Sequence, residues 1–445
     1  MTIDEWKKKS SGIKKYAHFD PRVSVEQVWD KISSPDWVEK HGFYPFISYE
    51  QVYYRYSKEK GRYKKIRPIC YSAHIDRCIY QYYGYLINEK YNSRVEKEGI
   101  GSVAIAYRNN LNKNNIDFSK QAFDFIRSYP EAYIIVGDFT DFFNNLDHAY
   151  LKDRLCDLME CSKLPGDYYA VLKNITKYSY WELKDILELN GLPDTIEGRT
   201  QLNNNDTALT MECFRQNKKK YLKRNTDLGI PQGSAISAVL SNVYMLQADI
   251  LMNQMVKSIG GLYMRYSDDF IVIIPSGDAA FFLDMYNKIM HIINEIPKLE
   301  LKQEKTQVYL YAENNVTNCN KLINPELEQG KNILNYLGFS FDGKRVFIRD
   351  KTISKYYYRM YRKARSIRKA NGVTKYGNII SNKKIYEKYS IKGSKQDDRN
   401  RHQKGNFITY VIRASSVYMD DDAVGKVMSN HMVKIKRATR RNSLK

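Results

Sequence analysis

The chain has 445 residues, of which 43% are hydrophobic and 13% aromatic, and its formal net charge is +22. A chain of this length and apolar content can bury a substantial core of two or three subdomains. Its six cysteines include no Cys-x-x-Cys pair, which argues against a zinc site or a disulfide framework and favours reduced thiols in the cytoplasm.

Residues 1–60 contain three tryptophans and several lysine clusters but no motif that indicates a function. They lack the apolar core of a signal peptide, and no run in the chain reaches transmembrane length. We therefore expect an N-terminal extension, a cytoplasmic location and no membrane partner.

An apolar run at 133–137 predicts a strand that ends at Asp138. An amphipathic helix led by Asp147 is expected to follow. Magnesium prefers oxygen ligands, so a carboxylate at a strand end is a candidate ligand if further carboxylates converge on it.

Residues 161–225 interrupt this pattern with a hydrophobic portion and a polar one, and we expect them to be mostly helical with one exposed loop. A Gly-Pro-Gly turn at 228–237 then opens a long helix through about residue 256. Backbone amides at such a helix start suit an anionic or polar substrate.

The tetrapeptide Tyr266-Ser267-Asp268-Asp269 lies between two apolar runs, which predicts a β-hairpin. Two adjacent carboxylates at its tip are costly unless cations neutralise them, and such a turn can hold divalent metal for phosphoryl transfer. Taken alone, the same pair is also compatible with an ordinary solvated turn. A helix at 279–296 and a strand at 307–311 are predicted next.

The positive charge is concentrated at the C-terminal end. Residues 344–445 contain 28 Lys and Arg against 7 Asp and Glu, whereas the preceding 343 residues contain 44 against 43. Tyrosines interleave with the basic side chains of a predicted helix at 353–369, which favours nucleic-acid binding over a merely solvated helical face. The residues expected to contact nucleic acid are Arg359, Arg362, Lys363 and Arg365.

Beyond that helix, a second helix is expected at 379–389, a loop at 392–403 and renewed order at 405–412. The aspartates at 420–422 are interpreted as the solvated start of a last helix rather than as a metal site, because acidic residues favour a helix N-terminus.

The strand to Asp138, the turn around Gln232 and the hairpin at Asp268 resemble, in this order, the reverse transcriptase family. Four more segments resemble the remaining family blocks, in family order across about residues 60–345: 65–69 with 76–77, 106–108 with 118–122, 301–306 and 335–339. The implied fold class is α+β, a right-hand polymerase with fingers, a palm of antiparallel sheet and helices, and an extended, mostly helical thumb. The implied division is 1–60 N-terminal extension, 61–130 fingers, 131–160 palm, 161–225 fingers or insertion, 226–343 palm, and 344–445 basic thumb and C-terminal region.

The resemblance implies that Asp138, Asp268 and Asp269 are metal ligands and that the carbonyl of Phe139 completes the shell. The implied cofactor is a pair of Mg²⁺ ions, with Mn²⁺ as a substitute. Lys305 matches a candidate proton donor to departing pyrophosphate, the alternative being an ordinary solvated lysine.

The resemblance also implies contacts with the nucleotide and the primer. Arg67 matches the residue that reaches the triphosphate, with Lys65 assisting it, and Phe143 matches a bulky side chain under the sugar. A phenyl ring there would clash with a ribose 2′-hydroxyl, so deoxynucleotides are the expected substrates. The other matched positions are Asp141, Gln232 and Gly233 at the nucleotide, and Leu337 and Gly338 at the primer grip.

The function implied is an RNA-directed DNA polymerase, a nucleotidyltransferase that copies an RNA template into DNA from deoxynucleotides. The extended C-terminal region looks most like that of bacterial phage-defence, or abortive-infection, reverse transcriptases, which implies a dedicated non-coding RNA. A retron or mobile-element enzyme is the first alternative, and a nucleic-acid-binding protein with a vestigial polymerase site is the second. The oligomeric state is left open, with a homo-oligomer among the alternatives.

Overall fold

A computed structural model describes residues 2–57, 61–225, 227–302, 305–370, 383–393, 405–419 and 421–440. The helices outside the C-terminal region are α1 (Ile3–Ser10), α2 (Trp29–Ile32), α3 (Pro35–Lys40), α4 (His74–Lys97), α5 (Asn115–Arg127), α6 (His148–Leu158), α7 (Gly166–Thr176), α8 (Leu183–Leu189), α9 (Ile196–Leu202), α10 (Met211–Tyr221), α11 (Ser237–Ser258), α12 (Ala279–Asn294) and α13 (Asn320–Ile323). Of the helices in the described ranges, none combines the length and hydropathy that a membrane span requires.

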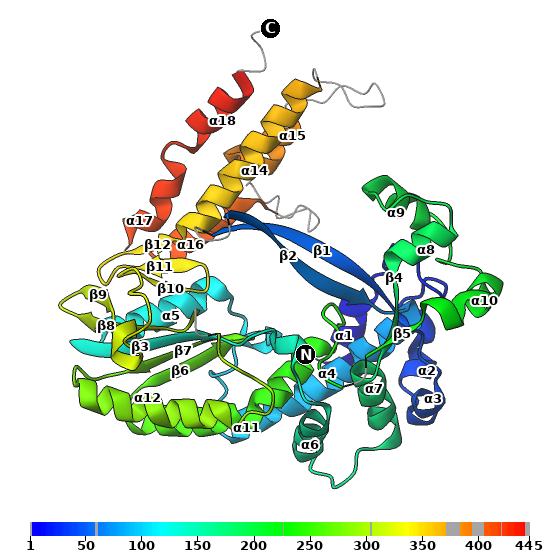
Figure 1. The fold of residues 1–445 in the computed structure, drawn as a ribbon, viewed down its shortest axis with the longest axis horizontal. Coiled ribbons are helices and arrows are strands. Elements are labelled where there is room, and N and C mark those ends of the chain that lie inside the picture. Colours follow the sequence, from blue (N-terminus) through cyan, green and yellow to red (C-terminus); the bar gives the residue numbers. More distant parts are fainter. Residues whose placement is uncertain are drawn as a thin grey trace.

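A five-stranded antiparallel sheet forms the centre of the molecule, in the order β6-β7-β3-β8-β9 (Figure 1). Its strands are β3 (Glu131–Asp138), β6 (Leu262–Tyr266), β7 (Asp269–Ile274), β8 (Gln307–Ala312) and β9 (Asn315–Asn318). The predicted strand before Asp138, the hairpin at Asp268 and the strand at 307–311 are therefore confirmed.

Side chains of β3 alternate between two hydrophobic cores, as a strand buried on both faces requires. Tyr133 and Ile135 pack in one core with α11 and α12, which lie beneath the sheet in Figure 1. Ala132 and Ile134 pack in the other core with α5 and the last strands. The long helix after the Gly-Pro-Gly turn is confirmed as α11, and the helix at 279–296 as α12.

A second sheet, of order β2-β1-β4-β5, carries a long hairpin that arches over the molecule (Figure 1). It consists of β1 (Phe46–Ser57), β2 (Gly61–Tyr71), β4 (Ser179–Glu182) and β5 (Lys223–Arg224). Strand β4 pairs with β1 in parallel, so the region 161–225 is joined by backbone hydrogen bonds to the N-terminal part of the chain. Its helices α7 to α10 agree with the mostly helical prediction, but the two short strands were not predicted.

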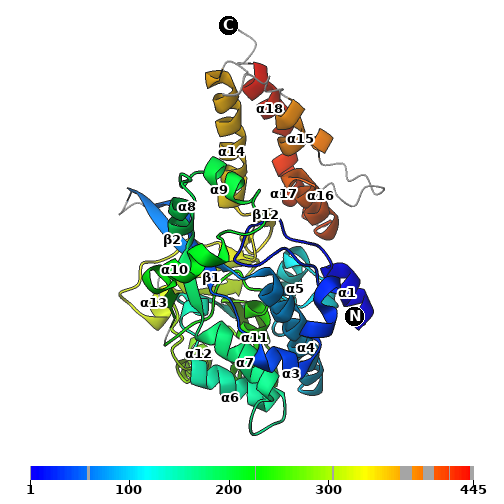
Figure 2. The ribbon, with the colours of Figure 1, turned by 90° about the vertical axis from the view of Figure 1, so that its right-hand side faces the viewer.

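The C-terminal region stands above the central sheet on a small three-stranded sheet (Figures 1 and 2). The strands are β10 (Leu334–Tyr336), β11 (Phe339–Phe341) and β12 (Val346–Ile348), and the helices are α14 (Asp350–Lys369), α15 (Lys383–Tyr389), α16 (Phe407–Val417), α17 (Asp422–Gly425) and α18 (His431–Arg440). The helix expected at 353–369 is confirmed as α14. Much of the loop predicted at 392–403, and the first part of the helix predicted at 379–389, lie outside the described residues.

One prediction for this region is wrong in part. A helix does begin after Asp421, but that carboxylate is buried instead of solvated. It accepts a hydrogen bond from the backbone N–H of Val346 at 3.2 Å and pairs with Arg127 at 3.1 Å. Asp421 therefore joins the C-terminal helices to β12 and α5, and these long-range contacts leave no local signal in the sequence.

Candidate active site

Asp138 and Asp269 lie directly opposite each other, at the end where β3 and β7 pair. The backbone N–H of Phe139 also donates to the carbonyl of Asp268 at 3.1 Å. The predicted convergence of the strand before Asp138 on the hairpin is therefore confirmed. Asp138 and the adjacent pair Asp268 and Asp269, which are about 130 residues apart in the sequence, thus lie at the same end of two paired strands.

The turn that carries Asp268 has an unusual backbone conformation, which a hydrogen bond from a buried side chain stabilises. Ser267 has a φ of 62°, which is uncommon for a residue other than glycine. The guanidinium of Arg265 donates to the Ser267 carbonyl at 3.0 Å, and it also forms a completely buried ion pair with Asp249 of α11. From the solvent side, the hydroxyls of Tyr107 and Ser267 are 3.1 Å apart.

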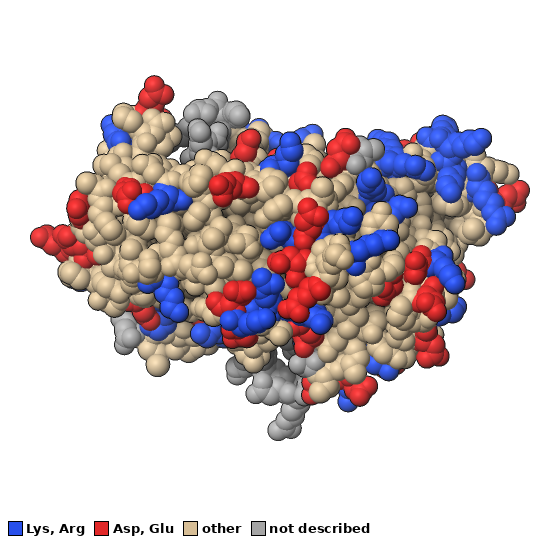
Figure 3. All heavy atoms as spheres, turned by 90° about the horizontal axis from the view of Figure 1, so that it is seen from below, with Lys and Arg blue, Asp and Glu red and all other residues tan. Residues whose placement is uncertain are grey.

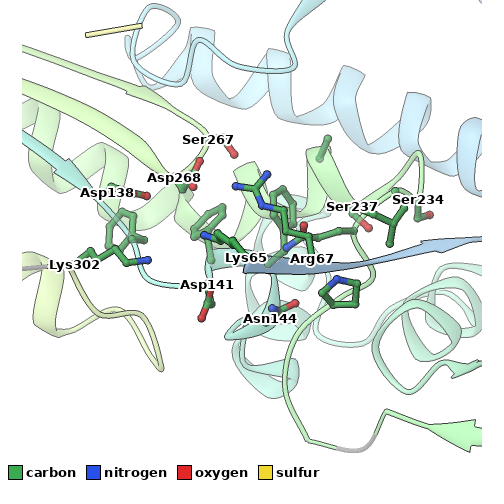
Figure 4. Close-up of a pocket in the computed structure, with 18 of the residues that line it drawn as sticks. Lys65, Arg67, Asp138, Asp141, Asn144, Ser234, Ser237, Ser267, Asp268 and Lys302 are labelled. Carbon is green, nitrogen blue, oxygen red and sulfur yellow. The ribbon is translucent and has the colours of Figure 1, made fainter. Parts of the chain in front are cut away.

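The turn opens into a cavity of about 480 Å³ between the central sheet, β2 and the start of α11. Figure 4 shows Asp138 and Asp268 beside each other in this cavity, with Lys65 and Arg67 extending toward them from β2. Ten predicted site residues line it: Lys65, Arg67, Asp138, Phe139, Asp141, Phe143, Gln232, Gly233, Asp268 and Lys305.

Gln232 and Gly233 are fixed against β2 by the backbone. The N–H of Cys70 donates to the Gln232 carbonyl at 2.9 Å. Gly233 has a φ of 113°, and a Cβ there would lie 2.6 Å from the Cys70 carbonyl oxygen. Only glycine suits both the conformation and the close approach.

The side chains at this end of the paired strands supply carboxylate oxygens, the ligand type that divalent cations prefer. Lys305 forms an ion pair with Asp138 inside the cavity, so a cationic group already faces that carboxylate. The surrounding protein desolvates Asp269, although part of its side chain is exposed, and raises its pKa to about 6; the negative charge of Asp268 adds to this rise, and Arg349 opposes it. Bound cations would relieve this repulsion.

In this structure the three aspartates are not yet arranged around a single metal position. Within the part of the chain that the structure describes, no three His, Cys, Asp or Glu side chains lie close enough together to hold an ion. The Lys305 ammonium competes for Asp138, and Asp269 does not line the cavity. A divalent ion would have to displace Lys305 and draw the carboxylates together.

A second candidate surface begins at the β10–β11 turn. Leu337 and Gly338 form this turn with φ values of 45° and 93°, and the side chain of Asn115 donates to the Leu337 carbonyl at 2.9 Å. Gly338 lies at one end of a groove of about 1290 Å³ along α14. The groove also contains Arg359, Arg362 and Lys363, but Arg365 is exposed outside its lining.

The functional-site candidates that the sequence did not reveal are Tyr107, Asn242, Asp249 and Arg265. Asn242 donates to the Ala106 carbonyl at 3.1 Å and accepts from Arg265 at 3.3 Å, so this network joins the Tyr107 segment to the turn. One signal was present: an arginine in an otherwise apolar strand is either exposed or paired with an acid, and Asp249 lies in the apolar helix α11.

Comparison with known proteins agrees with this geometry. The family model described as reverse transcriptase (RNA-dependent DNA polymerase) matches residues 58–341. The chain belongs to the reverse transcriptase family. Its α+β architecture is the reverse transcriptase fold, the fold of nucleotidyltransferases that make DNA on RNA. No curated protein matches the chain in sequence.

Three of the similar solved structures are telomerases from Candida species. Apo telomerase from Candida tropicalis is 12% identical, with 97% of this chain and 68% of that chain covered and a TM-score of 0.40. Telomerase from Candida albicans in complex with a TWJ fragment of telomeric RNA is 11% identical, with 94% of this chain and 66% of that chain covered and a TM-score of 0.38. Apo telomerase from C. tropicalis truncated from its C-terminal domain is 15% identical, with 74% of this chain and 61% of that chain covered and a TM-score of 0.36. This chain therefore covers 61–68% of the length of these telomerase chains.

Proposed function

We propose that this reverse transcriptase is an active RNA-directed DNA polymerase that joins deoxynucleotides on an RNA template by two-metal phosphoryl transfer. The observation that carries the proposal is the pairing of Asp138 with Asp269 at the edge of a cavity that also contains Asp268 and Arg67. In the reaction, the primer 3′ oxygen bonds to the α-phosphorus, the bond to the β-phosphate oxygen breaks, and pyrophosphate leaves. The primer hydroxyl loses its proton and the product DNA is one nucleotide longer.

We assign the binding of Mg²⁺, or of Mn²⁺ in its place, to Asp138, Asp268, Asp269 and the carbonyl of Phe139. When bound, a pair of these ions would lower the pKa of the attacking hydroxyl and neutralise the leaving oxygens. Lys305, once displaced from Asp138, would donate a proton to pyrophosphate. The cationic side chains of Arg67 and Lys65 would hold the triphosphate in the same cavity.

The remaining cavity residues would select and position the nucleotide. Phe143 lines the cavity half-buried and would exclude a ribose 2′-hydroxyl, while Gln232 and Gly233 would pack beside the incoming nucleotide. Asp141 lies at the cavity rim in a left-handed conformation with a φ of 41°. We place the primer end at Leu337 and Gly338, where the groove along α14 begins.

In this proposal the palm comprises 131–160 and 226–343, the fingers 61–130 and 161–225, and the thumb 344–445, with 1–60 as an N-terminal extension. The charge distribution supports a nucleic-acid path at the thumb. The face opposite the C-terminal helices carries acidic and basic side chains interspersed over much of its area (Figure 3). Among the described residues that line the groove of α14, in contrast, seven are basic and one, Glu387, is acidic.

We further propose that the enzyme acts in bacterial phage defence with a dedicated non-coding RNA as template. The support is the extended helical region beyond the primer grip, which looks most like that of defence-associated reverse transcriptases. A retron or mobile-element role is the competing proposal. Free thiols at all six cysteines are in keeping with a cytoplasmic site of action.

Primer extension on an RNA template tests the activity. Wild-type protein with Mg²⁺ or Mn²⁺ should incorporate labelled deoxynucleotides, and Asp268→Ala with Asp269→Ala should abolish incorporation while the protein stays folded. Asp284→Ala, on the exposed surface of α12, is the matched control and should leave incorporation unchanged. A folded wild-type protein that incorporates nothing would favour the vestigial-site alternative, and full activity of the double variant would rule out this site.

The RNA that co-purifies with the protein tests the biological role. Sequencing should find one non-coding RNA species together with DNA complementary to it. Unselective cellular RNA would contradict the dedicated template, and complementary DNA joined to its own template RNA would favour a retron.

A further inference from the structure

A second cavity, of about 370 Å³, adjoins the proposed nucleotide cavity. This volume lies within the range of small-ligand pockets, roughly 300–1000 Å³. We name it the tyrosine pocket after Tyr16, Tyr49 and Tyr71, which line it together with Arg199 and Asn203. Tyr16 and Tyr49 precede the segment that matches the reverse transcriptase family model, and Arg199 belongs to the region 161–225, for which the sequence indicated no role.

Several long-range contacts hold the walls of the tyrosine pocket together. Tyr16 donates to the Ser72 carbonyl at 3.0 Å, and its ring meets that of Tyr71 edge-on with centroids 4.8 Å apart. The next backbone N–H, of Ala17, donates to the side chain of Asn203 at 2.9 Å. The N-terminal segment and α9 are thus fixed around the pocket.

The chemistry of the tyrosine pocket suits a planar aromatic ligand with a nearby negative charge. Arg199 lies over the ring of Tyr49, 5.7 Å from its centroid. Its ion pair with Asp194 joins two partly exposed side chains, so that pair is weak and can yield to a phosphate. Aromatic rings beside an arginine are the means by which proteins hold unpaired bases of any sequence.

The two cavities share Ile69 and Gly233 as a common wall. Gly233 is held against Cys70 without room for a Cβ, so no side chain adds to the wall at this point. The template base that is being copied pairs with the nucleotide in the first cavity. The next base of the template is only one nucleotide further along the template strand. That neighbour is unpaired, because its partner nucleotide has not yet been added.

We propose that the tyrosine pocket binds the first unpaired template base beyond the base that is being copied. This inference rests on the proposed polymerase function and names where that function holds its single-stranded template. It gives residues 1–60 and 161–225 a shared role: they build a stacking pocket that keeps the template in register.

The test compares single-nucleotide incorporation on RNA templates that differ at one position. One template ends at the copied base, the second carries one further nucleotide, and the third carries an abasic site there. Base stacking is worth about 1–3 kcal/mol, so the second template should raise kcat/KM or template affinity by roughly 5- to 150-fold over the first. The abasic template should show little of this gain, because it supplies only the phosphate.

Variants assign the gain to the tyrosine pocket. Tyr49→Ala should lose most of the gain while matching wild type on the shortest template, and Tyr49→Phe should keep it because the ring remains. Arg199→Ala should lose only the smaller part of the gain that the phosphate contributes. Tyr169→Ala, an exposed tyrosine of α7, is the control and should behave like wild type.

The inference is overturned if wild type shows no gain, if the abasic template restores the gain, or if Tyr49→Ala retains it. An equal loss on all templates would also overturn it, since that would indicate a general structural effect. Absence of incorporation by wild type on any template would contradict the polymerase function itself, which separates the two failures.

Discussion

Arg265 and Asp249 form an ion pair of 2.6 Å with both side chains completely buried, directly beneath the turn that carries Asp268. Burial alone would lower the pKa of Arg265, but the Asp249 carboxylate outweighs this effect and raises it, so the arginine stays charged. The same guanidinium donates to the Ser267 carbonyl. A structural ion pair therefore fixes the backbone of a turn that we assign to metal binding.

Asp249→Asn should lower both stability and activity. The substitution leaves a buried guanidinium without its counter-charge, which costs about 3–5 kcal/mol in comparable cases. Urea unfolding should show this loss, and kcat should fall further than the fraction of folded protein because the turn shifts. Asp284→Asn breaks an exposed pair with Lys288 and should change neither quantity measurably. Equal stability of Asp249→Asn and wild type would contradict the role of the pair.

The groove of α14 should determine the salt dependence of nucleic-acid binding. Replacing Arg359, Arg362 and Lys363 together by Gln removes three groove cations. The slope of log binding constant against log salt concentration should then become shallower by roughly 2 to 3, because fewer counterions are released. Arg365→Gln, outside the groove, should leave the slope unchanged. The groove assignment would be refuted if Arg365→Gln changed the slope by one third or more of the change that the triple variant shows, since each groove cation would then count no more than Arg365.

Phe143→Ala should relax sugar selection. The ring lines the nucleotide cavity and packs edge-on against Phe142, with centroids 5.5 Å apart. Removing it makes room for a ribose 2′-hydroxyl, so the ratio of kcat/KM for deoxynucleotides to that for ribonucleotides should fall about 10- to 100-fold. Incorporation of deoxynucleotides should largely persist. An unchanged ratio would mean that Phe143 does not contact the sugar.

His18 should make the fold sensitive to acid. Its ring is fully buried; Nδ1 accepts from the Phe19 N–H at 2.8 Å, and Nε2 lies 3.3 Å from the Tyr71 carbonyl oxygen. Only the neutral ring protonated at Nε2 satisfies both contacts. Burial lowers the pKa of His18 to about 3, and His74 adds to the effect.

Between about pH 6.5 and 3 the unfolded chain therefore binds a proton that the folded chain does not. The stability contributed by neutral His18 is complete above pH 6.5 and is lost as the pH falls, by up to about 5 kcal/mol. Urea unfolding of His18→Asn should depend less on pH across this window than wild type does. The exposed His291→Gln should follow the wild-type curve, and an identical pH dependence for His18→Asn would refute the assignment.

The sequence predicted those parts of the site that are recorded in local patterns. The strand before Asp138 and the hairpin around Asp268 are apolar, β-branched runs that end in carboxylates, and the structure pairs them as expected. Gln232 and Gly233 lie in a Gly-Pro-Gly turn. This turn was predictable because glycine and proline are typical of turns. The helix α14 was predictable because the residues that it buries, among them Tyr357, Met360, Ala364 and Ile367, recur at helical spacing.

Contacts between distant segments could not be predicted in this way. Strand β4 has only four residues, and it pairs in parallel with β1, which is more than 120 residues away in the sequence. The burial of Asp421 depends on Arg127 and Val346, which are far away in the sequence. The tyrosine pocket likewise exists only because the N-terminal segment meets α9.

The central claim is that Asp138, Asp268 and Asp269 together bind a pair of divalent ions. Crystals of the protein with an RNA template, a primer lacking its 3′-hydroxyl, a deoxynucleoside triphosphate and Mn²⁺ test it directly, because the anomalous signal of manganese locates each ion. Two peaks should lie roughly 4 Å apart, in contact with Asp138 and Asp268, with Lys305 moved away from Asp138. Manganese bound elsewhere, or an intact Lys305–Asp138 ion pair with nucleotide in the cavity, would contradict the account.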